Sequence, residues 1–182
     1  MFNKVMAAAV AAAMGLVALS TTATAATSPV TATFQVLMKI NKVCTVTAGA
    51  ASNIQLGAVG GVDATSAVGT TGSNSFTVNC SNTTAYNMAL QSTNNASTAG
   101  LGTLKGTGAN TDTLTYQLYS DAAFTTVWGN NGVSSAATGN GKAGVGNGLS
   151  QSQTVYAKVT GAAPALVTPD NYSDTVTVSV YF

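Results

Sequence analysis

Residues 172–182, YSDTVTVSVYF, decide the fold class. From Val176 to Phe182 every second residue is large and apolar, and the residues between them are threonine, serine and tyrosine. A repeat of two places successive side chains on opposite faces of a strand, so this pattern is typical of a β-strand with one buried face. The sequence stops at Phe182 inside that alternation. We expect a domain that ends in this way to lack the strand that should come next.

The same alternation recurs in four earlier segments, which are separated by Gly, Asn, Ser and Thr clusters of turn composition. These segments are Phe76–Cys80, Tyr86–Leu90, Leu114–Leu118 and Val155–Val159. No segment after the first 25 residues has a sustained helical period. Many strands with long polar connections predict an all-β protein, an immunoglobulin-like β-sandwich of one domain. The Gly- and Asn-rich tract 133–150 predicts either a long surface loop or a short edge hairpin.

A further alternating segment lies just before the first cysteine, and it is unusually long. Its apolar positions are Val30, Ala32, Phe34, Val36, Met38 and Ile40. A free strand of this kind exposes a row of unpaired backbone groups, which is a template for pairing with another chain. Each large apolar side chain would contribute about 1.5–3 kcal/mol if it became fully buried in a neighbour. Alternation alone equally allows residues 30–41 to be the first strand of the protein's own sandwich.

The first 25 residues have the composition of a secretory signal peptide. Lys4 supplies the positive start, Val5–Leu19 is almost continuously apolar, and Ala23 and Ala25 give an A-x-A cleavage pattern. The apolar run is shorter than the roughly 20 residues that a membrane-spanning helix needs. We therefore expect removal of residues 1–25, export of the remainder, and no insertion into a membrane.

Two cysteines, Cys44 and Cys80, remain in the exported chain. An even pair in an exported protein predicts a structural disulfide. The alternative, a metal site, needs more ligands than two cysteines can supply in a chain without histidine.

Charged residues make up only 6% of the chain, and those left after removal of the signal peptide are five lysines and five aspartates. Nucleic-acid binding needs clustered basic residues, and so does electrostatic attachment to anionic membranes, so neither partner is expected. The absence of histidine excludes a Ser-His-Asp arrangement. We predict no catalytic, cofactor or metal site, and no enzyme activity.

The remaining notable side chains have structural interpretations. Asp170 and Asp174 lie near the start of the last strand, where their oxygens would accept backbone N–H groups in turns. Trp128 is expected to pack in the core rather than to form a binding platform. Tyr172 would form a corner, with its hydroxyl bonded to nearby backbone as in other sandwiches.

Three blocks of the sequence resemble the spore coat protein U domain family, which includes the archaic, Csu-type chaperone–usher pilins. The first block is the alternating N-terminal segment as it continues into Cys44–Val46. The second is Leu114–Gly129, LTYQLYSDAAFTTVWG, and the third is the stretch 172–182. Together the blocks span essentially the whole chain after the signal peptide.

The resemblance implies a sandwich that lacks its last strand and is completed by another molecule. It divides the chain into a signal peptide (1–25), an N-terminal donor-strand segment (26–41) and a pilin β-sandwich domain (42–182). Residues 30–40 would be the donor strand, and the disulfide would tie the first strand of the domain to the next. One wall of the acceptor groove, also used by the chaperone, would be formed by Val176, Val178, Val180 and Phe182.

The resemblance also implies partners and a location. The partners are a periplasmic chaperone, an outer-membrane usher, and copies of the protein itself or of related pilins. The location is an extracellular pilus that supports surface attachment and biofilm. The alternative that the residues leave open is a monomeric secreted β-sandwich binding module, in which residues 30–41 would pair within their own domain.

Overall fold

The computed structural model describes residues 27–60, 67–163 and 166–182, so the predicted signal peptide lies outside the described residues. The chain divides between Lys39 and Ile40 into two parts, which we describe separately. In the described ranges, no helix is long and apolar enough to cross a membrane.

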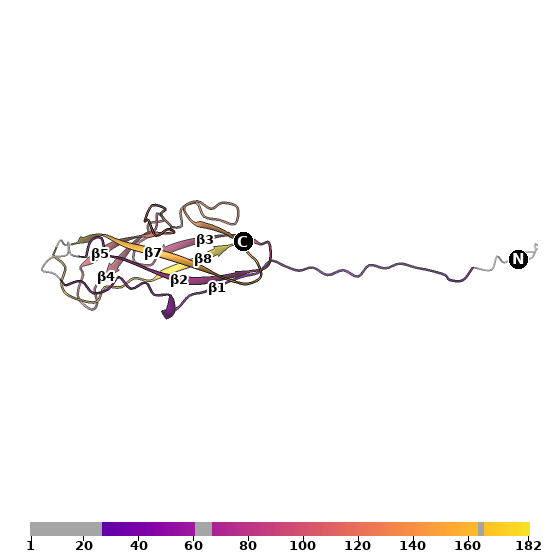
Figure 1. Ribbon diagram of the computed structural model, residues 1–182, viewed down its shortest axis with the longest axis horizontal. Helices are drawn as coiled ribbons and strands as arrows, with labels where there is room; N and C mark the ends of the chain where they lie inside the picture. The colour runs from indigo at the N-terminus through magenta and orange to yellow at the C-terminus, as the bar shows by residue number, and fades with distance from the viewer. Residues whose placement is uncertain (1–26, 61–66, 164–165) are drawn as a thin grey trace, which may run out of the picture. The chain divides into compact units, whose positions relative to one another are not determined.

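The second part is an all-β sandwich built from two antiparallel sheets (Figure 1). A five-stranded sheet has the order β1-β2-β7-β5-β4, and a three-stranded sheet has the order β6-β3-β8. The strands are β1 (Cys44–Thr47), β2 (Thr71–Cys80), β3 (Ala85–Ser92), β4 (Leu101–Lys105), β5 (Thr113–Tyr119), β6 (Lys142–Val145), β7 (Ser150–Ala163) and β8 (Val176–Tyr181). One short 3₁₀ turn, η1 (Ala50–Ser52), follows β1. The predicted immunoglobulin-like fold class is confirmed.

All five alternating segments of the domain form strands, and apart from Phe182, which follows β8 and is half exposed, their apolar positions are buried or partly buried. The buried core is contributed by β2, β3, β5 and β7 together with one loop residue, Trp128. Trp128 is fully buried, and its indole N–H donates to the carbonyl oxygen of Met88 at 3.0 Å. The prediction that Trp128 is a core residue is therefore confirmed.

Several elements differ from the sequence prediction. The short strand β4 was not predicted, because LGTLK is too short and glycine-interrupted to show alternation. The tract 133–150 contains β6, an edge strand paired with β3, and is otherwise mostly loop. Strand β7 is much longer than residues 155–159, because its polar first half pairs with β2 and its second half also pairs with β5.

The predicted disulfide joins Cys44 to Cys80. These residues face each other directly in the β1–β2 ladder, with their Cα atoms 4.1 Å apart. The bond therefore fixes the beginning of the domain to the end of β2.

Candidate functional site

The sandwich is open along one side, where two sheet edges face each other. Strand β1 pairs only with β2, and β8 pairs only with β3, within the residues that the structure describes. The chain after β1 continues through η1 to residue 59 along one rim, and residues 167–178 form the other rim. Two adjoining cavities lie between these rims, and we call them together the edge groove.

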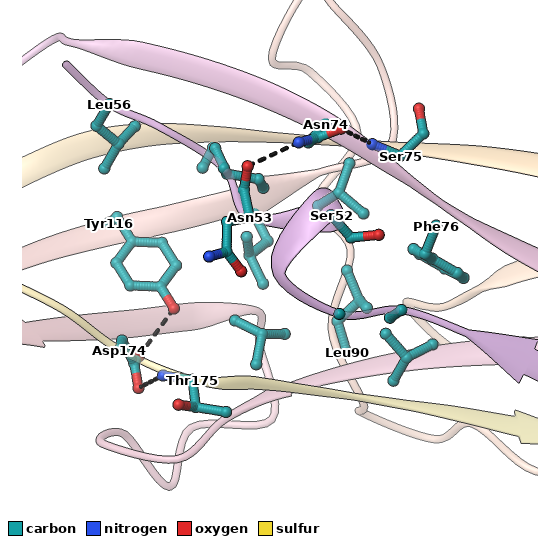
Figure 2. Close-up of a pocket in the computed structure, with 18 of the residues that line it drawn as sticks. Ser52, Asn53, Leu56, Asn74, Ser75, Phe76, Leu90, Tyr116, Asp174 and Thr175 are labelled. Atoms are coloured by element: carbon teal, nitrogen blue, oxygen red, sulfur yellow. Dashed lines mark hydrogen bonds between the residues drawn. The ribbon is translucent and has the colours of Figure 1, made fainter.

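The first cavity of the edge groove is mainly apolar and has a volume of about 400 Å³ (Figure 2). Its floor is the sandwich core, represented by Phe76, Leu90, Leu118 and Val155. Its rims carry Ile54 and Leu56 on one side and Val176 and Val178 on the other. An apolar strand could therefore lay its side chains directly on the core of the domain.

The second cavity continues past Asp174 and has a volume of about 710 Å³. It shares Ile54, Leu56, Leu104 and Asp174 with the first cavity, but much of its remaining lining comes from the polar segment 168–175. The edge groove thus has an apolar half beside the start of β8 and a more polar half upstream of it.

Burial differs sharply between β8 and the strand beside it. Met88 and Leu90 in β3 are fully buried, whereas Val176, Val178 and Val180 in β8 are only partly buried. The valines of β8 are only half-buried although the side chains of the adjacent strand β3 are fully buried. Apolar surface is therefore left uncovered at the β8 edge.

The structure places the predicted groove wall only in part at the groove. Val176 and Val178 line the first cavity. Val180 packs against the core, and Phe182 is 49% exposed, and neither lines the two cavities. The rim formed by residues 48–59 was not predicted at all.

A single side chain fastens that rim to the five-stranded sheet. The amide nitrogen of Asn74 in β2 donates to the carbonyl oxygen of Asn53 at 2.7 Å (Figure 2) and to that of Ala51 at 3.1 Å. The segment after β1 is thereby kept beside the groove, although it has left the β1–β2 ladder. The sequence carries no signal for this contact, because the partners are more than 20 residues apart and lie in segments without a motif.

The opposite rim is fastened by Asp174, which precedes β8. Its carboxylate accepts hydrogen bonds from the hydroxyls of Tyr116, at 2.8 Å, and Ser92. It also accepts backbone N–H groups from Asn94, Thr103 and Thr175. One carboxylate therefore ties the start of β8 to the end of β3, to β4 and to β5.

The electrostatics of this network favour a neutral tyrosine. Burial raises the pKa of the Tyr116 hydroxyl well above its usual range, and its hydrogen bond to the negatively charged Asp174 raises this pKa further. Tyr116 therefore remains a hydrogen-bond donor to the carboxylate at physiological pH.

Two neighbouring side chains have structural roles, and Asp170 accepts a local backbone N–H from Asn171 but bonds mainly to a distant loop. Asp170 accepts the backbone N–H and the hydroxyl of Thr107, and its pKa is lowered to about 2 chiefly by hydrogen bonds from Thr107 and Asn110. The hydroxyl of Tyr172 donates to the carbonyl oxygen of Thr168 at 2.6 Å, which is the expected corner.

The N-terminal part, residues 27–39, contains no strand in the described chain. Together with Ile40, its large apolar side chains are 82–88% exposed, and they include every predicted donor position except the small Ala32. The described residues offer no group of three or more His, Cys, Asp or Glu side chains that could hold a metal ion.

Comparison with known proteins identifies the family. The family model named Spore Coat Protein U domain matches residues 30–179. The chain belongs to this family. Proteins of the Spore Coat Protein U domain family are structural subunits and not enzymes. A search of curated proteins found no match.

A solved structure shows a similar fold at low sequence identity. One chain of the CsuC–CsuE chaperone–tip adhesion subunit pre-assembly complex, from archaic chaperone-usher Csu pili of Acinetobacter baumannii, matches with a TM-score of 0.52 and 18% identity. The match covers 79% of this chain and only 40% of that chain, so this protein spans two fifths of its length. The E. coli Hda pilus minor tip subunit HdaB matches with a TM-score of 0.32 and 15% identity, over 77% of this chain and 82% of that one.

Proposed function

We propose that this protein is a structural subunit of an extracellular chaperone–usher pilus, and that it polymerises by lending residues 30–40, the donor segment, to the edge groove of another copy. The observation that carries this proposal is the edge groove itself. It exposes the core of the sandwich between the segment 48–59 and the strand β8, which pairs on one side only among the described strands. Family membership and the Csu complex support the assignment to a pilus.

The donor segment has the chemistry that the apolar half of the edge groove requires. It presents an apolar residue at every second position from Val30 to Ile40. The residues on the other face are polar, with the single exception of Leu37. A strand that enters the groove would place its apolar face on Phe76, Leu90 and Leu118. Its backbone would add to the free edge of β8, which is the strand-addition mode of peptide recognition.

The proposal includes a path to the cell surface. The exported chain would first be held by a periplasmic chaperone that covers the β8 edge, and an outer-membrane usher would exchange the chaperone for the donor segment of the next subunit. An uncovered apolar groove is an aggregation hazard, which gives such a chaperone a physical purpose. The resulting pilus would serve surface attachment and biofilm formation.

The decisive experiment compares charge on the two faces of the donor segment. Phe34→Asp would bury an unpaired carboxylate in the groove, and we expect at least a ten-fold loss of polymer, since such burial costs about 1–3 kcal/mol or more. Thr33→Asp places the same charge on the opposite face and should leave polymer yield within two-fold, roughly. Electron microscopy for fibres and unboiled gel electrophoresis for ladders measure both variants.

A deletion and a transfer complete this test. Deletion of residues 27–41 should abolish fibres but leave a domain that binds the chaperone. Moving residues 28–41 to a position after Phe182, behind a short turn, should give a monomer of higher thermal stability, because hairpin-connected strands pair antiparallel and would fill the groove beside β8. Fibres from the deleted protein, or a wild-type chain that stays monomeric with residues 30–40 protected, would refute the proposal and favour the secreted binding module.

A further inference from the structure

We propose that Val43 is the residue that keeps the donor segment out of the groove of its own subunit, so that strand exchange takes place between copies. This inference rests on the proposed function. It concerns the short connection Asn41–Val43, which joins the donor segment to β1.

The two rims of the edge groove run in opposite directions. Along one rim, the residues advance from Ala48 in the first cavity to Val59 in the second. Along the other rim, they go back from Val178 in the first cavity to Val167 in the second. A strand in the groove is therefore antiparallel to one rim and parallel to the other.

This geometry leaves one route by which a subunit could fill its own groove. The donor segment is separated from Cys44 by three residues, whereas a parallel connection between neighbouring strands needs a dozen or more. The donor segment could therefore reach its own groove only by forming a hairpin with β1. In that hairpin it would lie antiparallel to β1 and to the 48–59 rim, and parallel to β8. A donor from another copy has no such restriction and can pair antiparallel with β8.

A hairpin with a two-residue turn at Asn41 and Lys42 is blocked by hydrogen bonds that Val43 already makes. The N–H of Val43 donates to the Ser81 hydroxyl at 2.9 Å, and its carbonyl oxygen accepts the Ser81 N–H at 2.9 Å and the Ser81 hydroxyl at 3.1 Å. Both backbone groups of Val43, which directly precedes β1, therefore point toward Ser81, the residue that follows β2. Val43 therefore cannot use its N–H to close a turn with Ile40 on the groove side.

A hairpin with a three-residue turn, Asn41–Val43, is blocked by the side chain of Val43. Such turns place their last residue in the left-handed region, where glycine is favoured. A β-branched residue is a genuine outlier there, and Val43 is not among the described residues with positive φ. The residue after Val43 is Cys44, which the disulfide to Cys80 holds in place. The turn of the hairpin therefore cannot be shifted further along the chain into β1.

The test replaces Val43 by glycine and, as a matched control, by alanine. Val43→Gly removes the left-handed penalty, which corresponds to roughly a five- to thirty-fold change in the equilibrium between self-closed and open chains. Val43→Ala removes the branched side chain but keeps that penalty, so it should polymerise like the wild-type chain. Size-exclusion chromatography measures the monomer fraction, and hydrogen exchange measures protection of residues 30–40 in the monomer.

We expect Val43→Gly to accumulate a monomer with residues 30–40 protected, at a rate independent of protein concentration, while Val43→Ala does not. A second variant, six Gly and Ser residues inserted between Lys42 and Val43, leaves the Ser81 contact intact and should self-close as well. The insertion keeps the inference testable if the glycine variant fails to fold.

The outcomes separate this inference from the proposed function. If Val43→Gly folds and polymerises as the wild-type does, with residues 30–40 unprotected in the monomer, the inference is overturned whatever the insertion variant does. If Val43→Gly fails to fold, the same behaviour of the insertion variant overturns it. In both cases the pilin assignment stands. If the wild-type chain itself forms no polymer, the proposed function has failed, and the inference fails with it.

Discussion

The carboxylate of Asp174 should be the most sensitive polar group of the domain outside the disulfide. It accepts five hydrogen bonds, from Tyr116, Ser92, Asn94, Thr103 and Thr175. Hydrogen bonds to a charged group contribute about 1.5–3 kcal/mol each. When the carboxylate is removed, a donor that can hydrogen-bond to water instead costs the protein little stability. Among these donors, the hydroxyls of Tyr116 and Ser92 belong to buried side chains. We therefore expect Asp174→Ala to lower the free energy of unfolding by about 2–4 kcal/mol.

A double-mutant cycle isolates the bond between Tyr116 and Asp174. Tyr116→Phe and Asp174→Asn should each cost about 1–2 kcal/mol, and the two together less than their sum, with a coupling free energy of about 1–2 kcal/mol. The control is Tyr119→Phe in the same strand, β5, because the Tyr119 hydroxyl makes no hydrogen bond in the described chain. That substitution should change stability by less than about 0.5 kcal/mol.

Urea unfolding of the monomeric fraction, followed by tryptophan fluorescence, measures all of these variants, since the single Trp128 lies in the core. A coupling free energy below about 0.5 kcal/mol would show that Tyr116 and Asp174 act independently. In that case Asp174 would serve the local turn before β8 rather than fasten the groove rim to the opposite sheet.

Two further predictions concern the disulfide and the acid range. Cys44 and Cys80 are 36 residues apart in sequence, so replacing both by serine should lower the free energy of unfolding by about 4 kcal/mol in the chain-entropy model, measured by urea unfolding with and without reductant. Asp170 has a pKa lowered to about 2 from an ordinary 3.8, so its contribution to stability is complete above about pH 4 and is lost as the pH falls toward 2. The amide resonance of Thr107, measured by NMR as a function of pH, should follow the titration of Asp170. The substitution Asp170→Asn should abolish this pH dependence. A transition between pH 5 and 8 would contradict the assignment to Asp170, although the chain has no histidine to explain it.

The strands of the domain were predictable wherever one face meets the core over several residues. Strands β2, β3, β5 and β8 show this alternation, and so does the second half of β7. Strands β4 and β6 have four or five residues and contain glycine, so local periodicity could not reveal them. Their positions follow from pairing with β5 and β3, which is tertiary information.

The candidate site was predictable from the sequence on one side only. The wall at β8 was expected from the family resemblance, and two residues of that set, Val176 and Val178, line the first cavity. The other rim depends on Asn74, which bonds backbone carbonyls rather than a recognisable partner side chain. Asp174 accepts a neighbouring backbone N–H as expected, but it does not lie in a turn, and its bonds to Ser92 and Tyr116 span 82 and 58 residues, which no local pattern reports.

The sheet edges themselves argue for where a partner strand belongs. Among the described strands four are edges, and natural sheets protect such edges with lysine or by covering them. Strand β4 ends at Lys105, where its backbone is also bridged to Ser173, and β6 begins at Lys142. Strands β1 and β8 contain no charged residue; β8 lines the edge groove, and β1 leads directly into the segment 48–59 that forms its other rim. The edges β4 and β6 therefore carry lysines that disfavour pairing with another strand, whereas β1 and β8 carry no such charge. Evolution of a monomer would favour charge at all four edges, whereas a subunit completed by its neighbour must leave β1 and β8 uncharged.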